Sequence, residues 1–272
     1  MINIGRHQNL SESDYNAIDA LRNSDIKYLL RSPAHYKYPP RPKGERRDIL
    51  LGKVVHTLVL TPERFEDQFI LPTTEKKPRK GSKAYDALQD FAGSREIIAQ
   101  DVYDQARYMR DALYAEPDVA KILAKFDAEV SYVAEIDLED GIKVPLKARL
   151  DIENSPVPGW DFDLKTISSI AKWEAHAEDF GYNTQQYHHP YVKSLALNQP
   201  VRRLGFILIE PEPPYVVELV WPDDRAVMKG AKDCNAAYEI YGDCRKTGVW
   251  PKKPMVKRVY GLPKWVKVDE DN

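Results

Sequence analysis

Three charged residues share one face of a short segment that is predicted to form a strand. In residues 160–166, the strand period of two puts Asp161, Asp163 and Lys165 on one face and the residues between them on the other. Burying three charges side by side on a central strand is costly unless they have a partner. A divalent cation is a suitable partner for Asp163, and Lys165 would then face an anionic substrate or a metal-activated water.

A second carboxylate can reach the same point. Asp151 ends the preceding predicted strand, twelve residues before Asp163. Two carboxylates and a lysine form an oxygen-rich site for a hard cation such as Mg²⁺, which completes its shell with waters and phosphate oxygens. The alternative is an exposed edge strand that carries solvated charges, because an Asp-Xaa-Lys triplet is common by chance.

The elements that must position these residues change character near residue 127. Before it, apolar residues recur at helical spacing, which predicts helices from Ser11 or Ser13 to Leu30, over 49–60 and across 84–126. After it, alternating residues predict strands over 130–138 and 142–150, joined by a hairpin turn at Asp140-Gly141. The remaining predicted elements are a strand at 160–166, helices near 168–180 and 183–197, strands at 204–210 and 216–221, and a helix at 225–247.

This order of elements predicts an α/β fold in which helices flank a central mixed sheet. The chain has 272 residues, of which 43% are hydrophobic and 30% charged, and this composition argues against a disordered protein. We expect one domain over 1–272, with a mainly helical part over 1–126 and the sheet and C-terminal helices over 127–272.

The cysteine content and the hydropathy of the sequence indicate the cellular compartment in which the protein works. The two cysteines, Cys234 and Cys244, fit neither a zinc ligand set nor a disulfide framework, which indicates a reducing compartment. The apolar runs are far shorter than the ~20 residues of a membrane span, and the N-terminus lacks the apolar region of a signal peptide. We therefore expect a cytoplasmic protein without a membrane partner.

Positive charge is concentrated near both ends of the chain, although the net charge is only -2. Basic residues outnumber acidic ones between Lys27 and Lys53, and no acidic residue lies between Arg245 and Lys267. Basic segments on both sides of a central part that carries the carboxylates could hold a polyanion over the site. The simpler interpretation of these charges is that they lie on solvated loops. The predicted phosphate contacts are Arg41, Lys43, Arg46, Arg47, Lys53, Lys252 and Lys253.

Several segments together resemble a known family. They are LLRSPAHY at 29–36, LGKVVHTLVLTP at 51–62, KARLD at 147–151, DLKT at 163–166, residues 206–215 and GVWP at 248–251. In order and spacing they resemble the exodeoxyribonuclease VIII (RecE-like) family of phage recombination exonucleases, within the PD-(D/E)XK nuclease superfamily. The resemblance covers nearly the whole chain and implies the PD-(D/E)XK nuclease core.

The resemblance also implies residue roles. Asp151 and Asp163 match the metal-binding carboxylates, and Lys165 matches the superfamily lysine, which makes these three the candidate catalytic residues. His56 matches a helical histidine at the metal site, and Glu129 an acidic residue beside the metals. The alternatives are a core histidine at 56 and a solvated acid at 129. We expect Mg²⁺ as the cofactor, with Mn²⁺ able to substitute.

A helical signature of related nucleases is imperfect in this sequence. The pattern Gln-Xaa-Xaa-Xaa-Tyr begins at Gln185, but His189 stands where the tyrosine would be. We therefore consider Tyr182, Gln185, Tyr187 and His189 as candidates to hold DNA near the site, without choosing among them.

The function implied by the resemblance is digestion of linear duplex DNA 5′ to 3′. The 3′ single strand left behind would pass to a single-strand annealing protein, and the enzyme would be a ring-shaped homo-oligomer in a bacterial or phage-infected cytoplasm. One alternative is another nuclease with this core, either structure-specific or Cas4-like, although two cysteines cannot supply the four iron–sulfur ligands usual in Cas4-like members. A non-catalytic DNA-binding module is the more distant alternative.

Overall fold

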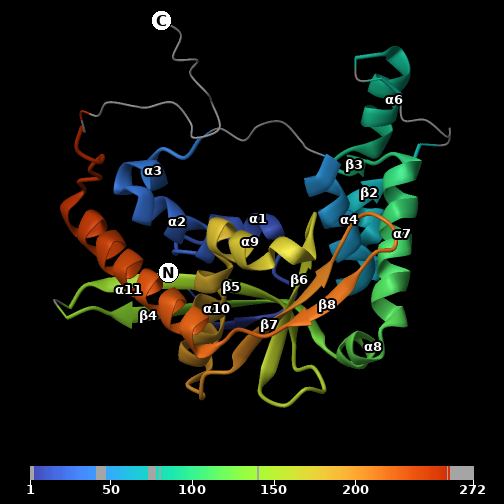
Figure 1. The fold of residues 1–272 in the computed structure, drawn as a ribbon. Helices are drawn as coiled ribbons and strands as arrows, with labels where there is room; N and C mark the ends of the chain where they lie inside the picture. The colour runs from blue at the N-terminus through green and yellow to red at the C-terminus, as the bar shows by residue number, and fades with distance from the viewer. Residues whose placement is uncertain are drawn as a thin grey trace, which may run out of the picture.

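A six-stranded mixed sheet forms the centre of the protein (Figure 1). The computed structural model describes residues 3–40, 47–72, 78–79, 81–139, 141–255 and 257. Neighbouring strands follow the order β1-β4-β5-β6-β7-β8. The strands are β1 (Gly5–His7), β4 (Asp127–Asp137), β5 (Lys143–Glu153), β6 (Trp160–Thr166), β7 (Arg203–Ile209) and β8 (Val217–Val220).

The sheet is mixed because one connection is a crossover. Strands β6 and β7 pair in parallel from Trp160–Arg203 to Thr166–Ile209, and the other neighbours pair antiparallel. A parallel pair needs a long connection. Here it consists of η2 (Ile170–Lys172), α9 (Trp173–Phe180) and α10 (Tyr182–Leu197). The crossover therefore carries α10 back across the strand that bears Asp163.

The other helices precede β4 in the sequence, except α11, which follows β8. They are α1 (Glu12–Ala17), α2 (Asn23–Arg31), α3 (Pro33–Lys37), α4 (Arg47–Leu60), η1 (Pro62–Arg64), α5 (Phe65–Gln68), α6 (Lys83–Ala92), α7 (Gln100–Ala115), α8 (Pro117–Leu123) and α11 (Asp224–Thr247). A two-stranded parallel pair, β2 (Phe69–Ile70) and β3 (Glu96–Ile97), lies outside the main sheet.

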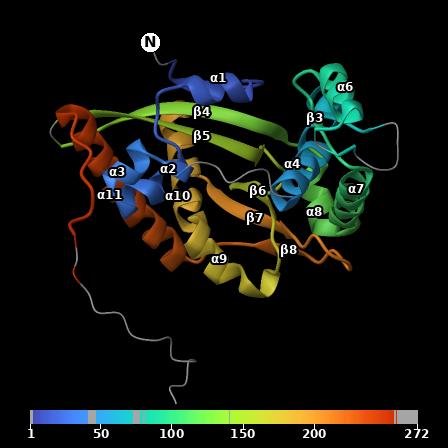
Figure 2. The ribbon, with the colours of Figure 1, turned by 90° about the horizontal axis from the view of Figure 1, so that it is seen from above.

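Two large apolar clusters attach the helices to the sheet. One joins α4, α7 and α8 to β6 and β7, with Phe162, Leu164 and Ile207 fully or almost fully buried. The other joins α2, α10 and α11 to β4 and β5. Seen from above, the two helical groups lie toward opposite ends of the sheet (Figure 2). Strand β6 lies between α4, which packs on one of its faces, and α10, which contacts the other.

The predicted α/β fold with a central mixed sheet is confirmed, and most predicted elements agree with observed ones within a few residues. The predicted helix from Ser11 to Leu30 is wrong: Ser11 caps α1, but the helix ends at Ala17 and α2 starts only at Asn23. Between them Leu21 forms a bridge with Leu146 of β5, which a continuous helix could not do. Asp140 of the predicted hairpin turn lies outside the described residues.

Three short strands, β1, β2 and β3, have two or three residues each and were not predicted. Strands this short carry too few residues for an alternating pattern to be recognised. In the described part of the chain, no helix combines the length and the apolar character that a membrane crossing requires.

Candidate active site

The candidate site lies where the sheet is interrupted twice. The register of β4 and β5 pairs Ala128 with Ile152 and Val130 with Leu150, but the position between them, Glu129 opposite Asp151, is skipped. Glu129 has a φ of 48°, in the left-handed region. Strand β5 then pairs with β6 at Ile152–Phe162 alone. The backbone around Asp151 is thus released from regular pairing on both sides.

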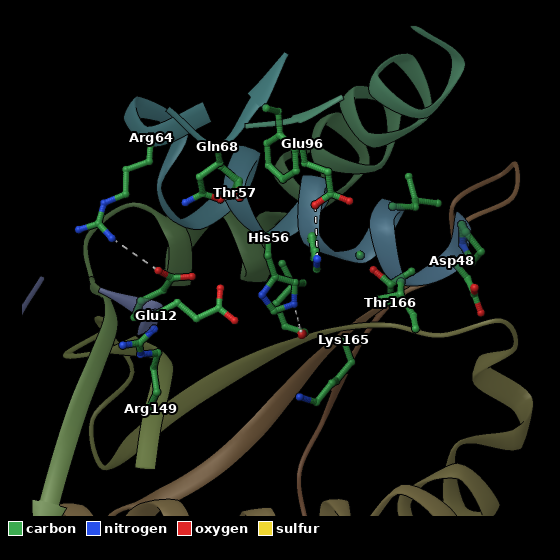
Figure 3. Close-up of a pocket in the computed structure, with 18 of the residues that line it drawn as sticks. Glu12, Asp48, His56, Thr57, Arg64, Gln68, Glu96, Arg149, Lys165 and Thr166 are labelled. Carbon is green, nitrogen blue, oxygen red and sulfur yellow. Dashed lines mark hydrogen bonds and ion pairs between the residues drawn. The ribbon is translucent and has the colours of Figure 1, made fainter. Parts of the chain in front are cut away.

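Two side chains satisfy the backbone that this interruption exposes. Asp151 Oδ2 accepts a hydrogen bond of 3.1 Å from the amide of Leu164. His56 of α4 donates from Nε2 to the carbonyl oxygen of Leu164 at 2.7 Å. Figure 3 shows the ring of His56 between α4 and β6, the strand that contains Leu164. Since buried backbone groups require partners, Asp151 and His56 take the place of a neighbouring strand.

The hydrogen bond of His56 also fixes its tautomer. A ring nitrogen that donates to a carbonyl must carry the proton, so in the neutral ring the lone pair is on Nδ1. Nδ1 lies 3.6 Å from Asp151 Oδ2. Burial lowers the pKa of His56, which favours the neutral ring. A neutral imidazole whose other nitrogen is held by a carbonyl is the usual form of a histidine that binds metal.

Asp163 is held from both sides of its carboxylate. Gln185 of α10 donates from Nε2 to Oδ1, and the ammonium of Lys165 contacts Oδ2. The same ammonium lies 5.1 Å from the ring centroid of Tyr182 and 5.9 Å from that of Phe206. The predicted shared face of Asp163 and Lys165 is confirmed, and it faces α10.

The carboxylates at the site repel one another. Burial raises the pKa of Asp151 well above its usual range, and the charge of Asp163 raises it further. Burial opposes the charge of Lys165, but the carboxylates of Asp163 and Asp151 outweigh it and raise the pKa of Lys165. Lys165 therefore stays protonated at neutral pH and supplies positive charge to the site.

A pocket of about 1250 Å³ opens beside these residues (Figure 3). His56, Glu129 and Lys165 are among its lining residues, and Asp151 and Asp163 lie directly behind them through the contacts described above. Glu129 faces Arg64 across 3.8 Å. The proposed metal ligands and the lysine thus lie in or just behind one wall of one pocket.

The residues present fit a divalent cation. Within the described ranges, no three His, Cys, Asp or Glu side chains are gathered closely enough to hold a metal ion as they stand. The chemistry of the donor set nevertheless suits one: a bound cation would reverse the raised pKa of Asp151 and use the free Nδ1 of His56. Asp151, Asp163, Glu129 and His56 would form the ligand set.

Three of the four DNA-binding candidates on α10 lie toward the site. Gln185 contacts Asp163, and Tyr182 lines the pocket beside Lys165. His189 follows Gln185 by one turn and is buried. Burial lowers the pKa of His189 well below its usual value, and the neighbouring His188 and Lys165 lower it further. Tyr187 lies on the other side of α10, where its ring stacks on that of Tyr191, in the cluster with α11.

The basic candidates are dispersed. Lys53 lines the pocket and pairs with Glu96 at 3.4 Å, whereas Arg47 pairs with Asp101 at 2.9 Å. Lys252 and Lys253 are exposed in the segment after α11 and are not part of the pocket lining. The candidates Arg41, Lys43 and Arg46 lie outside the described residues.

Sequence reasoning missed an ion network behind the site. Lys193 of α10 donates to Asp161 Oδ2 at 2.8 Å and lies 2.9 Å from Glu153 Oε2, and all three side chains are buried. Arg202 also pairs with Asp161 at 3.2 Å. Asp161, the third acid of the predicted face, is therefore neutralised by the protein itself. The only signal in the sequence was that Lys193 follows Gln185 by eight residues, a spacing that puts both on one broad face of a helix.

Comparisons with known proteins bear on the fold and the family of the chain. A protein from Eubacterium rectale named a "Putative exonuclease" has the same fold in its crystal structure, with a TM-score of 0.57 and 14% identity, over 94% of this chain and 96% of that one. No match was found among curated proteins. Residues 23–255 match the family described as a PDDEXK-like domain of unknown function (DUF3799). Because this match spans most of the sequence, the chain belongs to that family of PDDEXK-like domains.

Proposed function

We propose that the protein is a divalent-metal-dependent nuclease that hydrolyses DNA from an end. The observation that carries the proposal is the placement of Asp151, Asp163 and Lys165 around Leu164, in or just behind the wall of a large pocket. Membership of a PDDEXK-like family supports nuclease chemistry. The fold match over nearly the full length of a protein named as an exonuclease supports action at an end.

Each residue would have a separate task. Mg²⁺, held by Asp151, Asp163, Glu129 and His56, would lower the pKa of a bound water and offset negative charge at the phosphate. Lys165 remains an ammonium beside Asp163 and would donate to a phosphate oxygen or orient the attacking water. Gln185 is a positioning residue, since it holds Oδ1 of Asp163 and leaves the other oxygen toward Lys165.

The finer assignment rests on the sequence resemblance. We infer a RecE-like exonuclease that digests linear duplex DNA 5′ to 3′ and leaves a 3′ single strand for an annealing protein. The same resemblance supports a ring-shaped homo-oligomer and Mg²⁺ as the cofactor, with Mn²⁺ able to substitute. The segments DLKT and KARLD carry this inference, because they contain Asp163, Lys165 and Asp151.

The test is digestion of linear and covalently closed circular duplex DNA, with Mg²⁺ and with a chelator. We expect loss of linear DNA alone, only with metal, and release of label from the 5′ end before the 3′ end. Lys165→Met should abolish digestion, whereas Lys121→Met, at an exposed lysine of α8, should not. Cleavage of circular DNA at flaps or junctions would indicate a structure-specific nuclease, and binding without any cleavage would indicate a non-catalytic module.

A further inference from the structure

Three aromatic rings form a stack at the edge of the pocket. The ring centroids of Trp173 and Tyr182 are 5.3 Å apart with planes at 15°, and those of Tyr182 and Phe180 are 5.9 Å apart at 26°. The outermost ring, Phe180, is 54% exposed, and the ring of His176 packs against it at 5.7 Å between centroids with ring planes at 88°. An aromatic ring left this open at one end of a stack offers a flat apolar face to a further ring.

The stack is anchored firmly at its inner end. Trp173 and Tyr182 both pack on Phe206 of β7, with centroids 5.0 and 5.6 Å away. Between Phe180 and Tyr182, Gly181 adopts the left-handed conformation, with φ 75° and ψ 34°, and ends α9. A residue with a side chain is strained in this conformation, so the glycine lets both rings flank one tight turn. The stack is thus formed before anything binds.

The position of the stack links it to the proposed chemistry. Phe180 and Tyr182 line the same pocket as Lys165 and Glu129. The ammonium of Lys165 lies 5.1 Å from the centroid of Tyr182, the middle ring of the stack. A group that stacks on Phe180 would therefore lie in the same pocket as the residue that is proposed to contact a phosphate.

We propose that Phe180 binds the base of an unpaired nucleotide at the end of the DNA substrate. Nucleobases stack on aromatic side chains whatever their sequence, because every base has a flat π-face. Inside a duplex both faces of each base are covered by neighbouring bases, and a terminal pair exposes only its outer face, so an unpaired base reaches a protein ring more readily. The proposal rests on the proposed function and adds that the pocket receives a frayed or single-stranded end.

A nucleobase fits this surface better than an apolar peptide does. The rings of Trp173, Tyr182 and Phe180 lie in nearly parallel planes, which suits another planar ring. A base is attached to a phosphate, and the ammonium of Lys165 lies 5.1 Å from the middle ring of the stack. An aliphatic side chain would gain neither the stacking geometry nor the charge contact.

The test measures binding without cleavage. Hairpin DNA with a fluorescent adenine analogue as its terminal base, either paired or in an unpaired overhang, is titrated with the protein in chelator. We expect the wild type to bind the unpaired end more tightly and to quench its fluorescence. Phe180→Ala should weaken binding to the unpaired end about tenfold and remove the quenching, with little change for the paired end.

Two variants make the result specific. Phe180→Trp keeps a stacking ring and should retain the preference for the unpaired end. Phe91→Ala removes a phenylalanine on α6 that is 71% exposed and does not line the pocket, and it should bind both DNAs as the wild type does. Equal binding and quenching by the wild type and Phe180→Ala would overturn the proposal and leave Phe180 free to contact another protein.

Failure of this proposal is distinguishable from failure of the proposed function. Binding in chelator does not depend on hydrolysis, so a protein that never cleaves DNA can still show the stacking contact. Conversely, normal end-dependent digestion by Phe180→Ala, with an unchanged ratio of rates on frayed and paired ends, would contradict the stacking contact and leave the nuclease intact.

Discussion

Asp151 and His56 hold the two backbone polar groups of a single residue, the amide and the carbonyl of Leu164. Because Leu164 belongs to β6, the two side chains that bond the backbone of this strand are also side chains of the candidate site. Leu164 is itself buried in the cluster beneath α4, so its side chain and both backbone groups are fixed. Asp163 and Lys165, its neighbours in β6, are thereby held at a constant position.

Removal of Lys165 or Asp163 should abolish cleavage while the protein still folds, although loss of their ion pair lowers its stability. Charge and metal contributions to such reactions are worth several kcal/mol, so Lys165→Met and Asp163→Ala should each lose at least about a hundredfold in rate. The rate on linear duplex DNA and the melting temperature should be measured together, with Lys121→Met as the control. Near-normal digestion by either variant would remove these residues from the mechanism.

His56→Ala should weaken metal-dependent activity more than stability. The variant loses a proposed metal ligand, so a higher concentration of Mn²⁺ should be needed for half-maximal rate and should restore part of the activity. A titration of rate against Mn²⁺ measures this directly. A lower melting temperature with an unchanged metal requirement would instead assign His56 to the support of Leu164 alone.

Stability should fall in acid partly because of His188. Burial lowers the pKa of His188 from 6.5 to about 4, and its ring bonds the hydroxyl of Tyr238 and the carbonyl of Lys147. Between these pKa values the unfolded chain binds a proton that the folded chain does not, so stability is lost as pH falls from about 6.5 to 4, by up to about 1.4 kcal/mol per pH unit.

The variant His188→Gln tests this contribution. Urea unfolding at several pH values should give a shallower loss of stability toward acid than in the wild type, whatever the change at neutral pH. His7→Gln, in the edge strand β1, serves as the control. An identical pH dependence of His188→Gln and the wild type would show that His188 titrates alike in the folded and unfolded chains.

Lys193→Met should destabilise the protein strongly. The change takes from Asp161 and Glu153, both fully buried, the ammonium that they share, and leaves each carboxylate one arginine, Arg202 and Arg6 respectively. Removing one partner of a buried ion pair typically costs about 3–5 kcal/mol. Urea unfolding measures the loss, again with the exposed Lys121→Met for comparison. A loss below about 1 kcal/mol would mean that Arg202 and Arg6 alone neutralise the two carboxylates.

The basic residues should differ in their effect on DNA binding. Lys53 lines the pocket, whereas Lys252 and Lys253 do not. If Lys53 contacts a phosphate, Lys53→Gln should lower the slope of log affinity against log salt by about 0.9 on duplex DNA. The double variant Lys252→Gln/Lys253→Gln tests the second segment in the same way. An unchanged slope with an altered oligomeric state would assign that segment to assembly.

Local patterns in the sequence predicted much of the fold and part of the site. The alternation in residues 160–166 placed Asp163 and Lys165 correctly on one face, because strand geometry depends only on neighbouring residues. Helical spacing could also have separated the candidates on α10: Tyr187 is about 200° around the helix from Gln185, whereas Tyr182 and His189 are near the same side. The sequence therefore contained this distinction before the structure was known.

Other features depend on contacts between distant segments and left no local signal. The interruption at Glu129 and Asp151, and the divergence of β5 from β6, arise from how three strands meet. The free edge of β5 is taken by Leu21, which bonds Pro145 and Lys147 from far away in the sequence. The role of His56 at the Leu164 carbonyl likewise joins segments more than a hundred residues apart.

The hydrogen bonds from Asp151 and His56 to Leu164 limit which substitutions at these two positions an inactive relative could accept. A relative that no longer cleaved DNA would still need an acceptor for the amide of Leu164 and a donor for its carbonyl. Asparagine in place of Asp151 and glutamine in place of His56 could meet these needs, whereas alanine at either position would leave a backbone group unpaired. Inactive descendants should therefore keep polar residues at both positions, whereas Lys165, which bonds no backbone group and pairs with Asp163, could be lost together with that carboxylate.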